Sequence, residues 1–278
     1  MQIIGLLLAF IVLTAGFQVV ERRWPSVRGQ KRLRSGFFTD CVYWLFVPTV
    51  SKAFTGVVVF VAVLVAAELL GASITADDLR NRLVDRETAI SQWPVAIQIV
   101  AFVLTADFIG YWSHRAFHSF GQLWRIHSVH HSSTELDWLS AVRLHPLNDA
   151  LSAAITATPL LLLGFAPATV AVYLPFLTFY AILLHANVSW TLGPLGRVVV
   201  SPAFHRWHHS IEDAALDKNF GGLLTIWDRL FSTFYLPRGI QATRFGVKGD
   251  FVPQGFLSQM IYPLRSDKRR AMEQAVSA

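Results

Sequence analysis

Residues 93–118 read WPVAIQIVAFVLTADFIGYWSHRAFH, an apolar run followed by two histidines. From Trp93 to Trp112 it is apolar, with one charged residue, Asp107. A run of that length is enough for a helix to cross a hydrocarbon core of about 30 Å. His114 and His118 follow, four residues apart, and residues at that spacing share one face of a helix. The stretch therefore predicts a membrane-spanning helix that ends in a pair of imidazoles.

Similar apolar runs occupy most of the remaining chain. Met1 to Val20 carries no charge, Phe37 to Leu70 is apolar, and Leu151 to Leu184 is apolar around the helix breakers Gly164 and Pro167, which predict a hairpin of two helices. The chain is 53% hydrophobic and 15% charged, whereas soluble domains are roughly 25% charged. An ordinary soluble domain is excluded, and 17 Gly and 12 Pro without a repeat exclude fibrous and disordered chains.

Charges outside the apolar runs predict the topology. Met1–Val20 lacks the basic start of a cleaved signal peptide, so we expect a permanent helix. The basic run after it indicates a cytoplasmic loop, and beside a membrane helix this reading is preferred to a nucleic-acid patch. The run comprises Arg22, Arg23, Arg28, Lys31, Arg32 and Arg34, and a basic tail, expected on the same face, comprises Arg265, Lys268, Arg269 and Arg270.

Five crossings follow from a non-cytoplasmic N-terminus. Phe37–Leu70 is interpreted as an interfacial stretch containing Pro48 and then one crossing, with a hairpin of two crossings as the alternative. The charged stretch Asp77–Glu87 is expected in water on the far side. The predicted fold class is all-α, a multi-pass transmembrane helical bundle with a cytoplasmic-facing, histidine-rich helical cap. Its parts are an N-terminal transmembrane region (1–100), a catalytic domain (101–235) and a C-terminal cytoplasmic tail (236–278).

All ten histidines lie between residues 114 and 209. They form one HxxxH pair and two HxxHH triples, each predicted to share a helical face, and two separate residues. The pair is His114 and His118, the triples are His127, His130, His131 and His205, His208, His209, and the separate residues are His145 and His185. Imidazole suits Fe, Zn, Cu and Ni, so we expect more than one metal ion, bound less well below about pH 6.5, where imidazole becomes protonated.

Several known kinds of metal site are excluded. HExxH is absent, as are Glu-x-x-His pairs and the Cys-x-x-Cys-His haem signal. Cys41 is the single cysteine, so it provides neither an internal disulfide nor a thiolate cluster.

Residues around the histidines are expected to support them. Asp107 shares a helical stripe with His114 and His118 and is predicted to accept the second N–H of a ligand histidine; a pairing with Arg115 is the alternative. Ser201-Pro202 predicts a helix start. Residues 217–222 predict a turn, and 225–234 a helix or interfacial segment, in which Asp228 and Arg229 either anchor the last triple or form a solvated ion pair.

With these residues in view, the chain resembles the fatty acid hydroxylase superfamily, also called the sterol desaturase family, from about Ala101 to Tyr235. The last segment is similar to the alkylglycerol monooxygenase branch, and the Leu-His-Pro box to the sterol C-5 desaturase side. The resemblance rests on Asp107–His118 (DFIGYWSHRAFH), Trp124–Ser132 (WRIHSVHHS), Arg143–Pro146 (RLHP), His185–Val188 (HANV), Phe204–Ser210 (FHRWHHS) and Lys218–Phe234 (KNFGGLLTIWDRLFSTF).

The resemblance implies a non-haem di-iron centre that uses O2 to hydroxylate or desaturate a C–H bond of a lipid. It implies that the pair and both triples are iron ligands and that His185 is a ninth. His145 is assigned as a further candidate ligand, although its box is not common to every branch. Zinc could replace iron in purified samples. Two departures stand out: Ser232 replaces the usual glycine of the last motif, which is expected to affect the turn alone, and the first hundred residues carry no box.

Partners follow from the same chemistry. A lipid would enter from the bilayer, and sterol, fatty acyl, alkylglycerol and carotenoid lipids are all open. O2 activation needs two external electrons, and the chain has no G-x-G-x-x-G, flavin, haem or iron–sulfur motif, so a separate electron-donor protein is expected at the cytoplasmic face. No nucleic acid is expected. The alternatives are a histidine-rich metal transporter or metal-storing protein, whose ligands would lie near the bilayer midplane, and a zinc-dependent membrane hydrolase.

Overall fold

The computed structural model describes residues 2–69, 87–249 and 251–265 and the single positions 71, 75, 77 and 81. This part of the chain is helical and contains isolated β-bridges in place of strands, which confirms the all-α class. The helices are α1 (Gln2–Arg23), α2 (Phe37–Phe46), α3 (Lys52–Leu69), α5 (Val95–Ser119), α6 (Gly121–His131), α7 (Pro146–Leu162), α8 (Pro167–His185), α9 (Pro202–His208), α10 (Ile226–Leu230) and α11 (Phe256–Ile261). Shorter turns are η1 (Val47–Ser51), η2 (Ile90–Gln92), η3 (Trp138–Val142), η4 (Gly193–Arg197), η5 (Asp213–Ala215) and η6 (Tyr262–Leu264).

Three helical segments are long and apolar enough to cross a membrane, by length and composition. They are Ile3–Arg23, Phe37–Val65 and Val95–Ser119, and Pro175–His185 is a shorter apolar segment. A multi-pass helical protein was predicted, and these segments agree with it. The number of crossings and the cytoplasmic orientation stay predictions.

The segment after the basic run is one continuous helix from Phe37 to Leu69, made of α2, the π-helical turn η1 and α3. The alternative of a hairpin is therefore wrong for these residues. Pro48 lies in η1; proline lacks the N–H that an α-helix needs, and a wider turn accommodates it without ending the helix. Most of the charged stretch expected in water, residues 78–80 and 82–86, lies outside the described residues.

The hairpin expected in Leu151–Leu184 is confirmed by α7 and α8. Gly164 takes a φ of 95°, a conformation that favours glycine, and Pro167 begins α8. α7 starts earlier than the apolar run, at Pro146, because His145 caps it: the ring Nδ1 accepts the N–H of Leu147.

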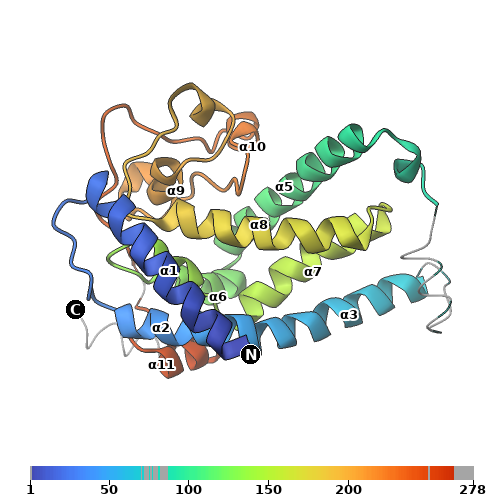
Figure 1. Ribbon diagram of the computed structural model, residues 1–278, viewed down its shortest axis with the longest axis horizontal. Coiled ribbons are helices and arrows are strands. Elements are labelled where there is room, and N and C mark those ends of the chain that lie inside the picture. Colours follow the sequence, from blue (N-terminus) through green and yellow to red (C-terminus); the bar gives the residue numbers. More distant parts are fainter. Residues whose placement is uncertain are drawn as a thin grey trace.

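Figure 1 shows how these elements position a site. The helices α3, α5, α7 and α8 extend toward one side of the molecule, while α6, α9 and α10 gather at the other. Phe102 of α5 packs against Phe165 and Tyr173 of the α7–α8 hairpin. The histidine-bearing ends of α5 and α8 therefore meet α6 and α9 at one end of the helical layer.

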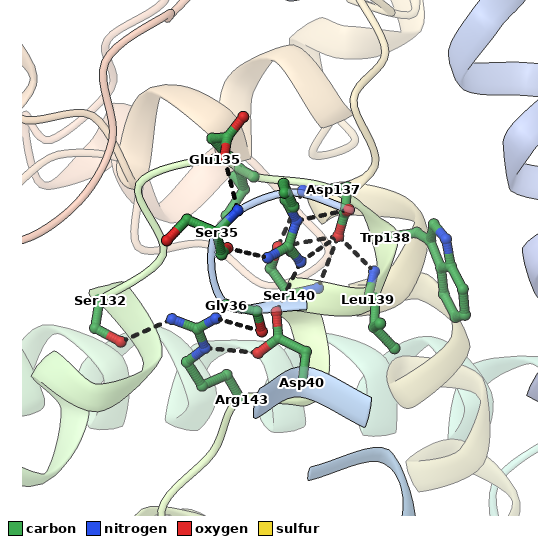
Figure 2. A network of polar contacts seen from close by, with 12 residues as sticks. Ser35, Gly36, Asp40, Ser132, Glu135, Asp137, Trp138, Leu139, Ser140 and Arg143 are labelled. Carbon is green, nitrogen blue, oxygen red and sulfur yellow. Dashed lines mark hydrogen bonds and ion pairs between the residues drawn. The ribbon is translucent and has the colours of Figure 1, made fainter. Parts of the chain in front are cut away.

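A buried ionic network fastens the segment after α1 to the histidine-bearing region (Figure 2). Arg34 donates to Asp40 at 2.7 Å and to Asp137 at 2.6 Å. Arg143 donates to the other oxygen of Asp40 at 2.6 Å and to Ser132. Arg34 is 4% exposed, so this member of the basic run is a structural cation and not part of a solvated loop.

Candidate metal centre

Nine histidines converge in two adjacent groups. Within each group one nitrogen of every ring lies within 4.8 Å of the others. The two groups touch, because the rings of His131 and His209 stack with centroids 4.2 Å apart. The first group is His114, His118, His127, His131 and His208, and the second is His130, His185, His205 and His209.

The HxxHH spacing explains this division. On α6, His127 and His131 are four residues apart and enter the first group, while His130 enters the second. At α9 the assignment is reversed: His205 and His209 enter the second group and His208 the first. Each triple therefore supplies an i, i+4 pair to one group and a single ring to the other.

In five of the histidines, a hydrogen bond at Nδ1 fixes which ring nitrogen carries the proton. We call these Nδ1 atoms the outer ring nitrogens and the Nε2 atoms the inner ones. A carbonyl oxygen only accepts, so each Nδ1 facing one must carry the proton and leave Nε2 with its lone pair. His114 Nδ1 lies 2.9 Å from the Phe220 carbonyl and His208 Nδ1 2.8 Å from that of Lys218. In the second group, His130 Nδ1 faces the Arg143 carbonyl and His185 Nδ1 that of Ala181. His127 Nδ1 faces the side-chain oxygen of Asn148 at 2.9 Å.

The inner nitrogens have a spacing that suits a shared cation. His114 Nε2 and His127 Nε2 are 3.1 Å apart, and so are His130 Nε2 and His185 Nε2. Because Nδ1 carries the proton in all four rings, both Nε2 atoms of each contact are acceptors with a lone pair. Neither can donate a hydrogen bond to the other. A metal bound about 2.0–2.1 Å from each imidazole nitrogen would place neighbouring nitrogens about 3.0–3.4 Å apart. The donor set therefore fits two metal ions, one in each group.

The loop between Lys218 and Leu224 carries two of the carbonyls that orient histidines, and two buried carboxylates hold it. Asp228 accepts the N–H groups of Phe220 and Gly221, both at 2.8 Å. Asp107 accepts the N–H groups of Leu223 and Leu224 and the indole N–H of Trp227.

Asp107 therefore acts through this loop, and the predicted hydrogen bond from a ligand histidine to Asp107 is wrong. The alternative partner is wrong too, because the guanidinium of Arg115 donates to Tyr111. Asp228 supports His208 through the loop, whereas Arg229 donates to the Arg197 carbonyl and stacks over Phe234.

His145 lies outside both groups, so the structure contradicts its assignment as a ligand. Its Nδ1 accepts from Leu147 and its Nε2 faces the Met260 carbonyl at 3.1 Å. Both ring nitrogens are therefore engaged in fixing the start of α7 and the position of α11.

Local structure after α8 agrees with the sequence. Ser201 caps α9 by accepting the N–H of Phe204, as predicted. Asp217 and Asn219 take φ values of 53° and 63°, which form the expected turn. Ser232, at the position where the resemblance implies glycine, lies in a turn and takes a φ of 58°, a conformation that favours glycine.

Burial keeps the histidines neutral. It lowers the pKa of the six that lie outside the long apolar helices well below the ordinary value, and neighbouring imidazoles lower it further. These are His127, His130, His131, His205, His208 and His209. Neutral imidazole is the form that binds metal.

Two openings reach the first group from different directions. An apolar cavity of about 670 Å³ lies among α3, α5, α7 and α8, and its lining includes His114 and Phe220. A more polar cavity of about 410 Å³ reaches His118, His131 and His208 and is lined by Trp124 and Asp217. The volume of the apolar cavity is in the range of small-molecule sites.

Sequence reasoning missed Asn148, which orients His127. Its only signal is a polar residue in the first turn of a helix otherwise leading into an apolar run, and residues of that kind commonly cap helices. The carbonyls of Arg143, Lys218 and Phe220 leave no trace in the side-chain pattern.

Comparison with known proteins agrees with this geometry. Residues 99–233 match the model of the fatty acid hydroxylase family. The ornithine lipid hydroxylase OlsE of Rhizobium tropici is 38% identical over 180 residues, which cover 64% of this chain and 54% of that protein. Human alkylglycerol monooxygenase is 37% identical over 131 residues, or 47% of this chain and 29% of that protein. A very-long-chain aldehyde decarbonylase of Oryza sativa subsp. japonica is 27% identical over 156 residues, or 51% and 24%.

The chain spans about half the length of the ornithine lipid hydroxylase and less than a third of the other two. No solved structure matches it significantly. The family match covers all nine converging histidines and the carboxylates that hold the loop. Residues 99–233 of this chain therefore form a domain of the fatty acid hydroxylase family.

Proposed function

We propose that this protein is a membrane-bound non-haem di-iron oxygenase that hydroxylates or desaturates a C–H bond of a lipid. The observation that carries this proposal is the pair of adjacent histidine groups, the first of which reaches an apolar cavity through His114. Relatives in the fatty acid hydroxylase family named as lipid hydroxylases and monooxygenases support it.

The nine converging histidines would hold two iron ions, which supply O2 activation when bound. In a hydroxylation, one oxygen atom enters the C–H bond and the other leaves as water, with two electrons and two protons supplied from outside. The chain's own contribution is to fix the ligand rings through the outer hydrogen bonds and to exclude water from the apolar cavity. Outer partners of this kind commonly affect metal affinity by about 10-fold to 100-fold.

We place the lipid substrate in the apolar cavity. Its lining includes the small residues Gly56, Gly110 and Ala153, which leave room for a chain between the helices. Candidate substrates include an ornithine lipid and an alkylglycerol, after the names of the relatives.

Electrons are proposed to come from a separate protein on the side of the polar opening. Trp124 lines that opening, and its ring centroid is 4.9 Å from that of His118 and 5.4 Å from that of His131. An aromatic ring in contact with two ligands offers a short path from the surface to the metal.

Metal analysis and a single turnover test this function. The purified full chain should contain about two irons, one for each histidine group. After reduction with dithionite and removal of the excess reductant, addition of 18O2 should give a co-purified lipid that has gained one labelled oxygen or lost two hydrogens. One iron per chain, or full metal content in a His130→Ala/His208→Ala variant, would contradict the di-iron proposal. Metal uptake into vesicles without lipid oxidation would favour the transporter instead.

A further inference from the structure

One side of the apolar cavity carries charged side chains that take no part in holding the metal site. Lys52 lines it, in the middle of the apolar helix Phe37–Val65. Within the described part of the chain its ammonium group has neither an ion pair nor a hydrogen bond. A charged side chain in a membrane-spanning segment is costly, and such residues commonly mark substrate paths.

One carboxylate that lines the same cavity makes its hydrogen bonds to groups other than Lys52. Asp149, on α7, also lines the cavity, and its Oδ2 accepts from Ser51 at 3.3 Å and from Thr55 at 3.1 Å. These hydroxyls lie on either side of Lys52 along the helix. The carboxylate thus holds α3 against α7 without pairing with Lys52.

The backbone before Lys52 is unusual. The π-helical turn Val47–Ser51 directly precedes it, and π-turns within α-helices frequently occur at functional sites. The inserted turn changes the helical register, so that Val47, Lys52 and Thr55 all reach the cavity.

A chain of contacts places this polar wall at the metal end. Asn148 receives the hydrogen bond of His127, and Asp149 is the next residue on α7. From Asp149, the lining continues along α7 to Leu161, about 18 Å of helix. Tyr173 lines the cavity beside Leu161, whereas Ala181, whose carbonyl faces His185, lines the metal end. Lys52 and Asp149 therefore lie toward the metal end of the cavity, and Leu161 and Tyr173 line its far end.

We propose that Lys52 binds an anionic oxygen group, a carboxylate or a phosphate, on the head of the lipid substrate. The tail then extends toward Leu161 and Tyr173, and the carbon that reacts lies beside the head and not at the end of the tail. This inference rests on the proposed function for the reaction, but the binding site can be tested without turnover.

The test uses the metal-loaded full chain in nanodiscs of neutral phosphatidylcholine. Dodecanoate, dodecyl phosphate and dodecanol compete with a fluorescent fatty-acid analogue. Wild type should prefer at least one anionic probe over dodecanol by about 10-fold to 100-fold, as expected for a charge-assisted hydrogen bond. Comparing the two anions distinguishes a carboxylate head from a phosphate head.

Variants assign the preference to Lys52. Lys52→Gln should abolish it and Lys52→Arg should retain most of it, while the exposed control Arg238→Gln should leave it unchanged. A wild type without preference, or a Lys52→Gln variant that keeps it, overturns the inference. If the preference depends on Lys52 but no lipid is oxidised, the binding site stands and the proposed reaction fails.

Under single-turnover conditions, the preferred probe should be oxidised on a carbon close to its head. Oxidation at the chain terminus would overturn the proposed orientation while leaving the oxygenase function intact.

Discussion

Asp107 and His114 are joined through one loop and not to each other. Asp107 accepts the N–H groups of Leu223 and Leu224, and His114 donates from Nδ1 to the carbonyl of Phe220 in the same loop. We predict that Asp107→Ala destabilises the fold by about 1–3 kcal/mol for each buried donor left unpaired. It should also weaken iron binding, because the loop no longer fixes the His114 ring. Thermal unfolding and iron retention against a chelator measure both effects.

Asp107→Asn is the matched comparison, because its remaining amide oxygen still accepts part of these hydrogen bonds. It should lie between wild type and Asp107→Ala in both measurements. An Asp107→Ala variant with wild-type stability and iron content would contradict the role of this carboxylate.

Asn148 is predicted to control metal affinity without binding metal. Asn148→Ala removes the acceptor 2.9 Å from His127 Nδ1, so the ring loses its fixed tautomer. Iron affinity should fall by about 10-fold to 100-fold, measured by chelator competition. Asn148→Asp keeps an acceptor and should recover most of the affinity; equal losses in both variants would show that packing, and not the hydrogen bond, matters.

The sequence predicted the helical class, the α7–α8 hairpin and the nine histidines that converge, because all three depend on local spacing. It did not predict how the triples divide, since His130 and His208 join different groups only when α6 meets α9. The prediction that Asp107 shares a helical face with His114 and His118 was correct. The hydrogen-bond partners of Asp107, Leu223 and Leu224, lie more than a hundred residues after it in the chain. The helical periodicity of the sequence cannot predict a contact between residues so far apart.

Acid should destabilise the metal-free protein. The six buried histidines outside the spans have a lowered pKa. Above about pH 6.5 they are neutral in the folded and unfolded chains alike. Below it, the unfolded chain binds protons that the folded chain cannot, so the free energy of unfolding falls by up to about 1.4 kcal/mol per pH unit for each histidine.

Melting temperatures of chelator-treated protein between pH 8 and pH 5 test this prediction. The curve should be flat above pH 7 and fall below pH 6.5, and metal-loaded protein should release its metal in the same acid range. A melting temperature that does not change down to pH 5 would contradict the buried, neutral state of these rings.

The two neighbouring cations Arg34 and Lys31 are predicted to differ sharply. Arg34→Ala leaves the buried carboxylates of Asp40 and Asp137 without their shared partner, and breaking a buried pair in this way costs about 3–5 kcal/mol. Lys31→Ala removes an exposed charge and should change stability by less than about 0.5 kcal/mol. Unfolding midpoints in detergent compare them, and similar midpoints would contradict the assignment of Arg34 to a structural network.

Single histidine variants should separate the two metal sites. His208 belongs to the first group and His130 to the second, although each lies next to a residue of the other group. His208→Ala should lower iron content by about one ion and His130→Ala by about one, because each group is expected to hold one ion. The double variant should lose both, while His145→Ala, outside both groups, should keep both. Iron counted per chain after purification provides the measurement. Loss of both ions from either single variant would mean that the two groups form one interdependent site.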